Sequence, residues 1–186
     1  MPTLTRPNAP VPGVVSTAAE PLARVRIVLV DTLEPANIGA AARAMKTMGL
    51  TRLTLVRPAQ FPHGSACRLA LSANDILDRA EVAATLKAAV AGCDQVYGVS
   101  ARQRHIPLPP LLPREFATRA LAAAAAADIA VVFGGEEAGL SNVDLMLCAE
   151  LVQIPSDPHC RSLNLAAAVQ LIAYELRLAW LDGDTR

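Results

Sequence analysis

The feature that most constrains this chain is a strand, a helix and a second strand in close succession. Residues 25–30, Val-Arg-Ile-Val-Leu-Val, are mostly β-branched and apolar, which predicts a buried strand. Between Asn37, a favourable N-cap, and Gly49, a favourable helix stop, apolar residues recur at helical spacing. Residues 52–56 predict the next strand. Such a βαβ unit pairs its two strands in parallel.

The alternation of strands and helices continues to the end of the chain. Further strands are predicted at 94–99, 129–133 and 151–154, and further helices at 81–91, 114–127, 163–181 and, behind a capping box at Ser141–Asp144, one short turn. The last helix is apolar on most sides, which predicts burial against more than one neighbour. We therefore expect an α/β fold with a mostly parallel sheet of five or six strands and helices on both faces.

Composition favours one globular domain and excludes several classes of protein. The chain has 186 residues, of which 53% are hydrophobic and 18% charged. We expect a flexible Pro-rich leader over residues 1–23, one domain over 24–182 and a tail over 183–186. Seventeen basic residues balance 17 acidic ones, and aromatic residues make up 3% of the chain. This argues against a strongly basic nucleic-acid coat and an aromatic base-stacking platform, and leaves room for a local basic patch.

Cysteine and histidine spacing gives no sign of a metal site or a disulfide framework. The four cysteines form no CxxC pair and no zinc-ligand pattern with histidine, so buried or partly buried reduced thiols and no bound metal are expected. The sequence shows no signal peptide, and no apolar stretch of about 18 residues marks a membrane span. A cytoplasmic location without membrane contact is therefore expected.

The loops after the predicted strands are where a ligand is expected, because open parallel sheets bind ligands beyond the carboxyl ends of their strands. These loops are residues 31–39, 100–105, 134–140 and 155–162, and they carry Gly, Arg, Glu and Ser. No GxGxxG, P-loop or GxSxG motif occurs. Taken singly, each feature has an ordinary alternative. The glycine loop is consistent with a simple turn, Arg43 with a solvated side chain, and Arg102, Arg104 and His105 with a solubilising loop or a polyanion contact.

Taken together, three segments resemble the motifs of the SpoU/TrmH family of RNA ribose 2′-O-methyltransferases. They are residues 37–45, residues 133–141 with a G-x-E-x-x-G-L core, and residues 154–155 with 162–166. The resemblance extends from about residue 25 to residue 180. Three further stretches, residues 42–50, 100–102 and 170–175, are similar to the TrmJ type of this family, which methylates the ribose of nucleotide 32 in the tRNA anticodon loop. The sequence departs from the family pattern in two places. Gly135 stands where the family often has a larger residue, and the additional segment that usually follows the catalytic domain is not seen in a sequence that stops at Arg186.

The resemblance implies a SPOUT-type fold with a C-terminal trefoil knot, a homodimer, S-adenosylmethionine as cofactor and RNA as substrate. A tRNA is the first expectation, and an rRNA target or a catalytically silent RNA-binding module of the same fold are the alternatives. The residues implied in cofactor binding are Ser100, Ala101, Arg102, Gly134, Gly135, Glu136, Gly139, Ile154, Ser162 and Leu163.

The residues implied in catalysis are Arg43, Asn37, Glu136, Ser162 and Asn164. Arg43 would orient the 2′-hydroxyl and its phosphate, because a guanidinium is a poor base. Asn37 would hold the ribose or the Arg43 segment, and Glu136 would position Arg43 or a substrate group. Ser162, also an expected N-cap, and Asn164 would bind cofactor or RNA. The basic residues expected to face RNA phosphates are Arg43, Lys46, Arg102, Arg104 and Arg161.

Overall fold

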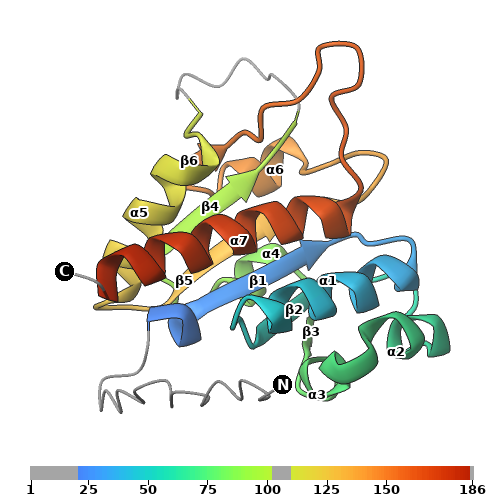
Figure 1. Ribbon diagram of the computed structural model, residues 1–186. Helices are drawn as coiled ribbons and strands as arrows, with labels where there is room; N and C mark the ends of the chain where they lie inside the picture. Colours follow the sequence, from blue (N-terminus) through green and yellow to red (C-terminus); the bar gives the residue numbers. More distant parts are fainter. Residues whose placement is uncertain (1–20, 102–109, 185–186) are drawn as a thin grey trace, which may run out of the picture.

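The computed structural model describes residues 21–101 and 110–184 and confirms an α/β fold built on one parallel sheet (Figure 1). Its six strands lie in the order β3-β2-β1-β5-β4-β6, and every adjacent pair is parallel. The strands are β1 (Val25–Val30), β2 (Arg52–Val56), β3 (Glu81–Ala83), β4 (Gln95–Val99), β5 (Ile129–Phe133) and β6 (Glu150–Val152). The helices are η1 (Pro21–Arg24), α1 (Pro35–Thr47), α2 (Gly64–Ala70), η2 (Leu71–Ala73), α3 (Asn74–Asp78), α4 (Leu86–Ala89), α5 (Pro113–Ala124), α6 (Asn142–Leu145) and α7 (Leu165–Asp184).

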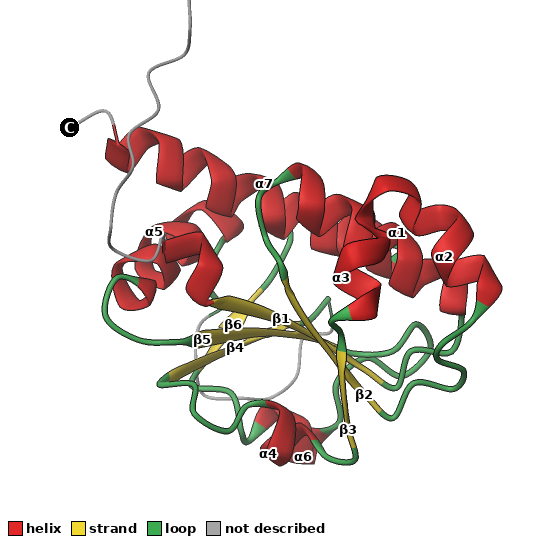
Figure 2. Ribbon diagram, turned by 90° about the horizontal axis from the view of Figure 1, so that it is seen from below, coloured by secondary structure: helices red, strands yellow, loops and turns green. Residues whose placement is uncertain are grey.

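Helices cover both faces of the sheet, as expected, but very unequally. In Figure 2, α1, α2, α3, α5 and α7 lie on one face, whereas the short α4 and α6 lie on the other. Alternate residues of β1 divide between the two layers. Val25, Ile27 and Leu29 belong to the larger apolar cluster, and Val28 and Val30 to the smaller. A strand buried on both faces carries apolar residues on both sides, and this is why β1 is apolar except at the half-buried Arg26.

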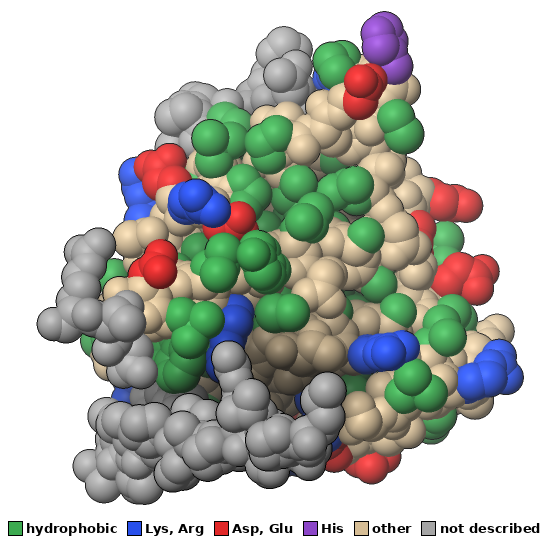
Figure 3. All heavy atoms as spheres, viewed as in Figure 1, with side chains coloured by type: hydrophobic (Ala, Val, Ile, Leu, Met, Phe, Trp, Pro, Cys, Tyr) green, Lys and Arg blue, Asp and Glu red, His purple; other side chains and the backbone are tan. Residues whose placement is uncertain are grey.

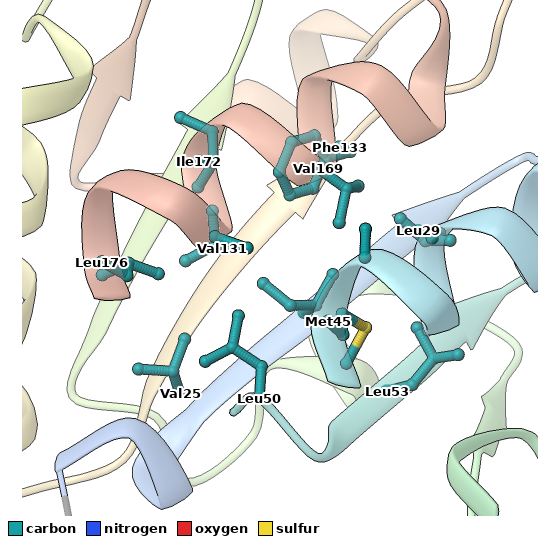
Figure 4. Packing of buried hydrophobic residues seen from close by; sticks show 14 of the residues in the cluster. Val25, Leu29, Met45, Leu50, Leu53, Val131, Phe133, Val169, Ile172 and Leu176 are labelled. Atoms are coloured by element: carbon teal, nitrogen blue, oxygen red, sulfur yellow. The ribbon is translucent and has the colours of Figure 1, made fainter. Parts of the chain in front are cut away.

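The larger cluster is packed between one face of the sheet and the helices α1, α2, α3, α5 and α7. Figure 4 shows Val169, Ile172 and Leu176 of α7 beside Val131 and Phe133 of β5, with Met45 of α1 nearby. Val169, Ile172 and Leu176 are fully buried. The expectation that the last helix packs against more than one neighbour is confirmed, since α7 contacts both α1 and α5.

The predicted first helix is confirmed, with its start corrected. It begins at Pro35 behind Glu34, so Asn37 is not the N-cap. Proline suits the first helical turn because it has no N–H to leave unpaired there. The stop at Gly49 is right: this residue has φ +84°, and the N–H of Leu50 donates to the carbonyl of Met45 at 2.9 Å. These are the features of a Schellman motif, which needs a left-handed residue at this position.

The helix predicted over 81–91 is wrong in its first half. Glu81–Ala83 forms β3, whose Val82 pairs with Leu55 of β2. Only Leu86–Ala89 is helical. Thr85 is its N-cap, and the hydroxyl of Thr85 accepts from the N–H of Ala88. Three residues have no measurable periodicity, so the free edge of β2, rather than a local preference, decides their conformation.

The other boundaries move by a few residues. The last strand, predicted over 151–154, is Glu150–Val152. The last helix, predicted over 163–181, begins at Leu165 and continues to Asp184, into the expected tail. Leu22 is 1% exposed within η1, so packing against the core begins before the expected domain start at residue 24. The cysteines are free thiols; Cys93 and Cys148 are partly buried, as expected, but the expected burial is wrong for the exposed Cys67 and Cys160. Among the described helices, none combines the length and apolar character needed to cross a bilayer.

Gly39 sets how closely α1 and α2 approach each other. A Cβ atom at Gly39 would lie 2.0 Å from the carbonyl oxygen of Ala66, which is backbone and cannot rotate away. We therefore expect Gly39→Ala to destabilise the chain by about 1–3 kcal/mol through overpacking. Gly64→Ala is the matched control, because a Cβ atom at that position would have no neighbouring atom of the described residues within 4 Å. Urea denaturation of the two variants measures the difference, and equal stabilities would contradict the proposed contact.

Candidate active site

A cavity of about 820 Å³ opens beyond the carboxyl ends of β4, β5 and β6. Its wall is formed by Val99, Ser100, Ala101, Phe133, Gly134, Gly135, Glu136, Glu137, Gly139, Ile154, Pro158, His159, Arg161, Ser162, Leu163, Leu165 and Ala168. All the described residues that the sequence implied in cofactor binding line this cavity. Arg102, the remaining one, lies outside the described residues.

The wall formed by residues 134–139 is a backbone loop closed on itself. The N–H of Gly139 donates to the carbonyl of Gly135 at 2.9 Å, and Gly139 has φ +64°. A Cβ at Gly134 would lie 2.1 Å from the carbonyl carbon of Gly139, and one at Gly135 would lie 2.4 Å from the carbonyl oxygen of Asp31. The glycine at position 135, a departure from the family pattern, is therefore required in this chain by the close approach of the turn after β1.

Glu136 joins this loop to the segment between β1 and α1. Its carboxylate accepts from the N–H of Leu33 at 3.0 Å, the N–H of Glu34 at 3.3 Å and the side-chain amide of Asn37 at 2.7 Å. Burial alone would raise the pKa of Glu136, but these hydrogen bonds to the ionised form outweigh it, and the pKa lies below its ordinary value. Glu136 was expected to position Arg43 or a substrate group. Its three donors lie in the segment that leads into α1, the helix that carries Arg43.

Asn37 and Asn164 extend the connection to the start of α7. The amide of Asn164 donates to the side-chain oxygen of Asn37 at 2.9 Å, and the oxygen of Asn164 accepts from the N–H groups of Ala166 and Ala167. Asn164 is therefore the N-cap of α7, and the expectation that Ser162 has this role is wrong. Ser162 lies two residues earlier, where it lines the cavity.

The predicted basic residues are not gathered at one place. Arg43 is exposed on α1 and is absent from the cavity wall of its own chain. Lys46 binds the carboxylate of Asp75 and the carbonyl of Ser72, so α3 already neutralises it. Arg161 does line the cavity, with its Nε donating to the carbonyl of Pro158 at 3.2 Å. Arg104 and His105 lie outside the described residues.

Some features of the site had no signal in the sequence. The N–H groups that Leu33 and Glu34 donate to Glu136 belong to the backbone, and any residue except proline supplies one. Glu137 and His159 line the cavity, although no sequence motif assigned either of them a role. Within residues 21–101 and 110–184, no three His, Cys, Asp or Glu side chains come together as a metal would require.

Comparison with known proteins places the chain among methylases. A relative from Pseudomonas aeruginosa, described as a tRNA (cytidine/uridine/adenosine-2′-O-)-methyltransferase TrmJ, is 56% identical over 164 residues. That match covers 88% of this chain and 64% of the relative, so the chain spans less than two thirds of the relative's length.

Solved structures of proteins described as methylases or methyltransferases are also similar to this chain. A probable methylase family protein from Haemophilus influenzae superposes with TM-score 0.85 at 44% identity, over 89% of this chain and 70% of the other. A probable methyltransferase from Bordetella pertussis superposes with TM-score 0.80 at 40% identity, over 86% of this chain and 98% of the other.

The parallel sheet and the glycine-walled cavity at its carboxyl edge thus define an α/β protein of the methylase class. More specifically, residues 24–174 match the SpoU rRNA methylase family, and the chain belongs to that family.

The hydrogen bonds of Glu136 give it a measurable effect on acid stability. Because its pKa is lowered by folding, the ionised carboxylate stabilises the fold above about pH 4.5, and this contribution is lost as the pH falls through the lowered value. We expect Glu136→Gln to cost about 1 kcal/mol at pH 7 and to make the unfolding free energy fall less steeply below pH 4.5. Urea titrations at several pH values measure both quantities. Parallel curves for the two proteins would contradict this role of the carboxylate.

Proposed function

We propose that this chain is an S-adenosylmethionine-dependent RNA 2′-O-ribose methyltransferase that acts on tRNA in the cytoplasm, with nucleotide 32 of the anticodon loop as its target. The observation that carries the proposal is the single cavity formed by residues 100–101, 134–139 and 154–163. Two of the three motif segments contribute to its wall, and the remaining one is hydrogen-bonded to them through Asn37. The methyltransferase TrmJ from P. aeruginosa, 56% identical, supports the tRNA substrate.

The cavity suits the proposed cofactor in size and chemistry. Its volume of about 820 Å³ lies within the range of about 300–1,000 Å³ that small-molecule sites occupy. Val99, Phe133 and Ile154 offer an apolar wall for a purine, while the backbone of residues 134–139 and the hydroxyl of Ser162 offer hydrogen-bonding groups. When bound, S-adenosylmethionine supplies an electrophilic methyl group attached to a positively charged sulfur.

In the proposed reaction the ribose 2′-oxygen forms a bond to the methyl carbon while the carbon–sulfur bond breaks, and the hydroxyl proton leaves. The protein therefore orients the hydroxyl and stabilises the negative charge that develops on its oxygen as the proton leaves. A guanidinium is a poor base, so the role of Arg43 is to hold the hydroxyl and the neighbouring phosphate and to stabilise the developing negative charge. The phosphate is the group that helps carry the proton. Glu136, Asn37 and Asn164 hold the segments that present Arg43 and the cavity wall.

We also infer a homodimer, from an apolar seam on the outer face of α7. Every third or fourth residue contributes to this seam, which consists of Ala167, Leu171, Tyr174, Leu178 and Leu181. Leu171, Tyr174 and Leu181 are 42%, 46% and 43% exposed. Figure 3 shows apolar side chains gathered over α7 in the middle of this face. Such spacing is the pattern by which two helices pack together, and a second copy of the chain would cover it.

The dimer also offers a place for Arg43. Its helix α1 packs beside α7 (Figure 1), and its side chain does not reach the cavity of its own chain. We propose that pairing through α7 brings Arg43 of one protomer toward the cavity of the other.

The trefoil knot remains part of the proposal. Support for it comes from the path of the C-terminal part: β6 is at the edge of the sheet, whereas α7 returns to pack against α1, which follows the central strand β1. The segment 153–164 between them forms part of the cavity wall, so a knot would place the cofactor against it.

Two alternative functions compete with this proposal. The matching family is named for rRNA methylases, so an rRNA substrate is the first alternative. The second is a silent RNA-binding module, in which the cavity would take no cofactor. Methylation assays with tRNA and rRNA, and calorimetry with S-adenosylmethionine, separate the three.

Radiolabelled methyl transfer from S-adenosylmethionine to tRNA transcripts tests the proposal directly. We expect methylation at one anticodon-loop ribose, and we expect Arg43→Ala to lower the rate by at least about 100-fold while cofactor binding is retained. Lys87→Ala removes an exposed cation from α4, on the opposite face of the sheet, and is expected to leave the rate unchanged. Near-normal turnover of Arg43→Ala would remove this arginine from the mechanism, and no cofactor binding by the native chain would remove the proposal.

The seam on α7 predicts a change in oligomeric state. Leu171→Glu places a charge in the middle of the seam and is expected to convert the dimer into a monomer, because an unpaired charge in an apolar interface is costly. Met146→Glu is the control, since this residue of the α6 region is 85% exposed on the other face. Light scattering after gel filtration measures the mass. A dimer that survives Leu171→Glu would show that another surface is used.

A further inference from the structure

Two non-glycine residues in left-handed conformation end neighbouring strands beside the active site. Asp31 follows β1 with φ 52°, and Arg57 follows β2 with φ 49°. L-residues rarely adopt this region, and it persists only where surrounding contacts impose it. Such outliers gather at functional sites more often than elsewhere, so the contacts that hold these two residues bear on the site.

The side chains of the two residues bind each other in a bidentate pair. The Nε of Arg57 donates to one carboxylate oxygen of Asp31 at 2.8 Å, and Nη2 donates to the other at 3.0 Å. The backbone pairs as well, since the N–H of Asp31 donates to the carbonyl of Val56 at 2.9 Å. The hydrogen bond to Asp31 raises the pKa of Arg57, and the negative charge of Asp144 in the capping box of α6 adds to this effect.

Arg57 also reaches the end of β3. Its N–H donates to the carbonyl of Ala83 at 3.2 Å, and its guanidinium is 3.5 Å from the carbonyl of Ala84. One arginine therefore connects the carboxyl ends of three adjacent strands, β1, β2 and β3. It lies outside the cavity wall, so its effect on the reaction passes through Asp31.

Asp31 transmits this connection to the site in two ways. Its carbonyl oxygen lies so close to Gly135 that no Cβ fits between them, and Gly135 is part of the cavity wall. Asp31 also starts the segment whose Leu33 and Glu34 N–H groups bind Glu136. That segment leads directly into α1, which carries Asn37 and Arg43.

We propose that Arg57, through its ion pair with Asp31, is a positioning residue for methyl transfer: it holds the turn after β1 against Gly135 and so sets the place of α1 relative to the cofactor cavity. The inference rests on the proposed function. Both side chains are about half exposed, at 42% and 51%, so the pair adds little to global stability. Its effect belongs to the geometry of the reaction, where small displacements of reacting groups are costly.

The test compares neutral variants of this pair with those of a matched pair. Arg57→Gln and Asp31→Asn remove the charges, and asparagine tolerates left-handed backbone. The control is Arg52→Gln, which breaks the Arg52–Asp128 pair of 2.6 Å at the opposite, amino-terminal edge of the sheet. For each purified full-length chain, the melting temperature, kcat for tRNA methylation and the Kd for S-adenosylmethionine are measured.

We expect Arg57→Gln and Asp31→Asn each to lower kcat about tenfold and to change the cofactor Kd less than about threefold. The double variant should lose no more than either single variant, because the two residues act as one unit. Arg52→Gln should retain the kcat of the native chain. Should Arg57→Gln fail to fold, Asp31→Asn and its comparison with Arg52→Gln carry the test.

Two results would overturn the inference. One is a kcat within about twofold of the native value in both single variants. The other is an equal loss in Arg52→Gln, which would reveal a general effect of weakened stability. Inactivity of the native chain itself is a separate outcome, since it counts against the proposed function and not against the role of Arg57 within it.

Discussion

The site depends on one carboxylate, that of Glu136, which satisfies three donors from a segment about one hundred residues earlier in the chain. Through Asn37 and Asn164 the same connection reaches the first turn of α7. Each side-chain amide in this connection has one orientation that satisfies its partners. Asn37 donates to the carboxylate and accepts from Asn164, whose oxygen caps the positive end of α7. The connection therefore determines which way both amides point, and it ties three loops that share no local contacts along the chain. Removing any member leaves a donor or acceptor without its partner.

Close backbone approach is the second constraint on the site. Gly134 and Gly135 let the loop after β5 fold onto itself and onto the turn after β1, so the cavity wall is largely main chain. A main-chain wall offers hydrogen-bonding groups whose positions do not depend on rotamers. The Asp31–Arg57 pair supports this wall from outside the cavity, at the ends of β1 and β2. The geometry of the candidate site thus rests on contacts that are mostly between loops, with the sheet as a rigid base.

Prediction from the sequence succeeded where a local pattern was long. The strands β1, β2 and β5 were predicted at their observed bounds, because β-branched and apolar residues dominate each of them. Short elements failed. Residues 81–83 became a strand because β2 had an unpaired edge, and the Asn164 cap of α7 was assigned to Ser162 because either residue type is a good N-cap. The motif segments line the cavity or are hydrogen-bonded to its wall, yet the partners of Glu136 and Asn37 were not predicted.

The sequence by itself determined the α/β class, the parallel pairing and three of the loops that contribute to the cavity wall. These follow from apolar periodicity, from the position of glycines and from the rule that ligands lie beyond carboxyl strand ends. Only the tertiary structure decided the contacts between loops: Glu136 with Asn37, Asp31 with Gly135, and Arg43 outside its own cavity. The physical reason is that hydrogen bonds and close approaches between distant segments depend on the relative placement of whole elements. No local pattern encodes that placement.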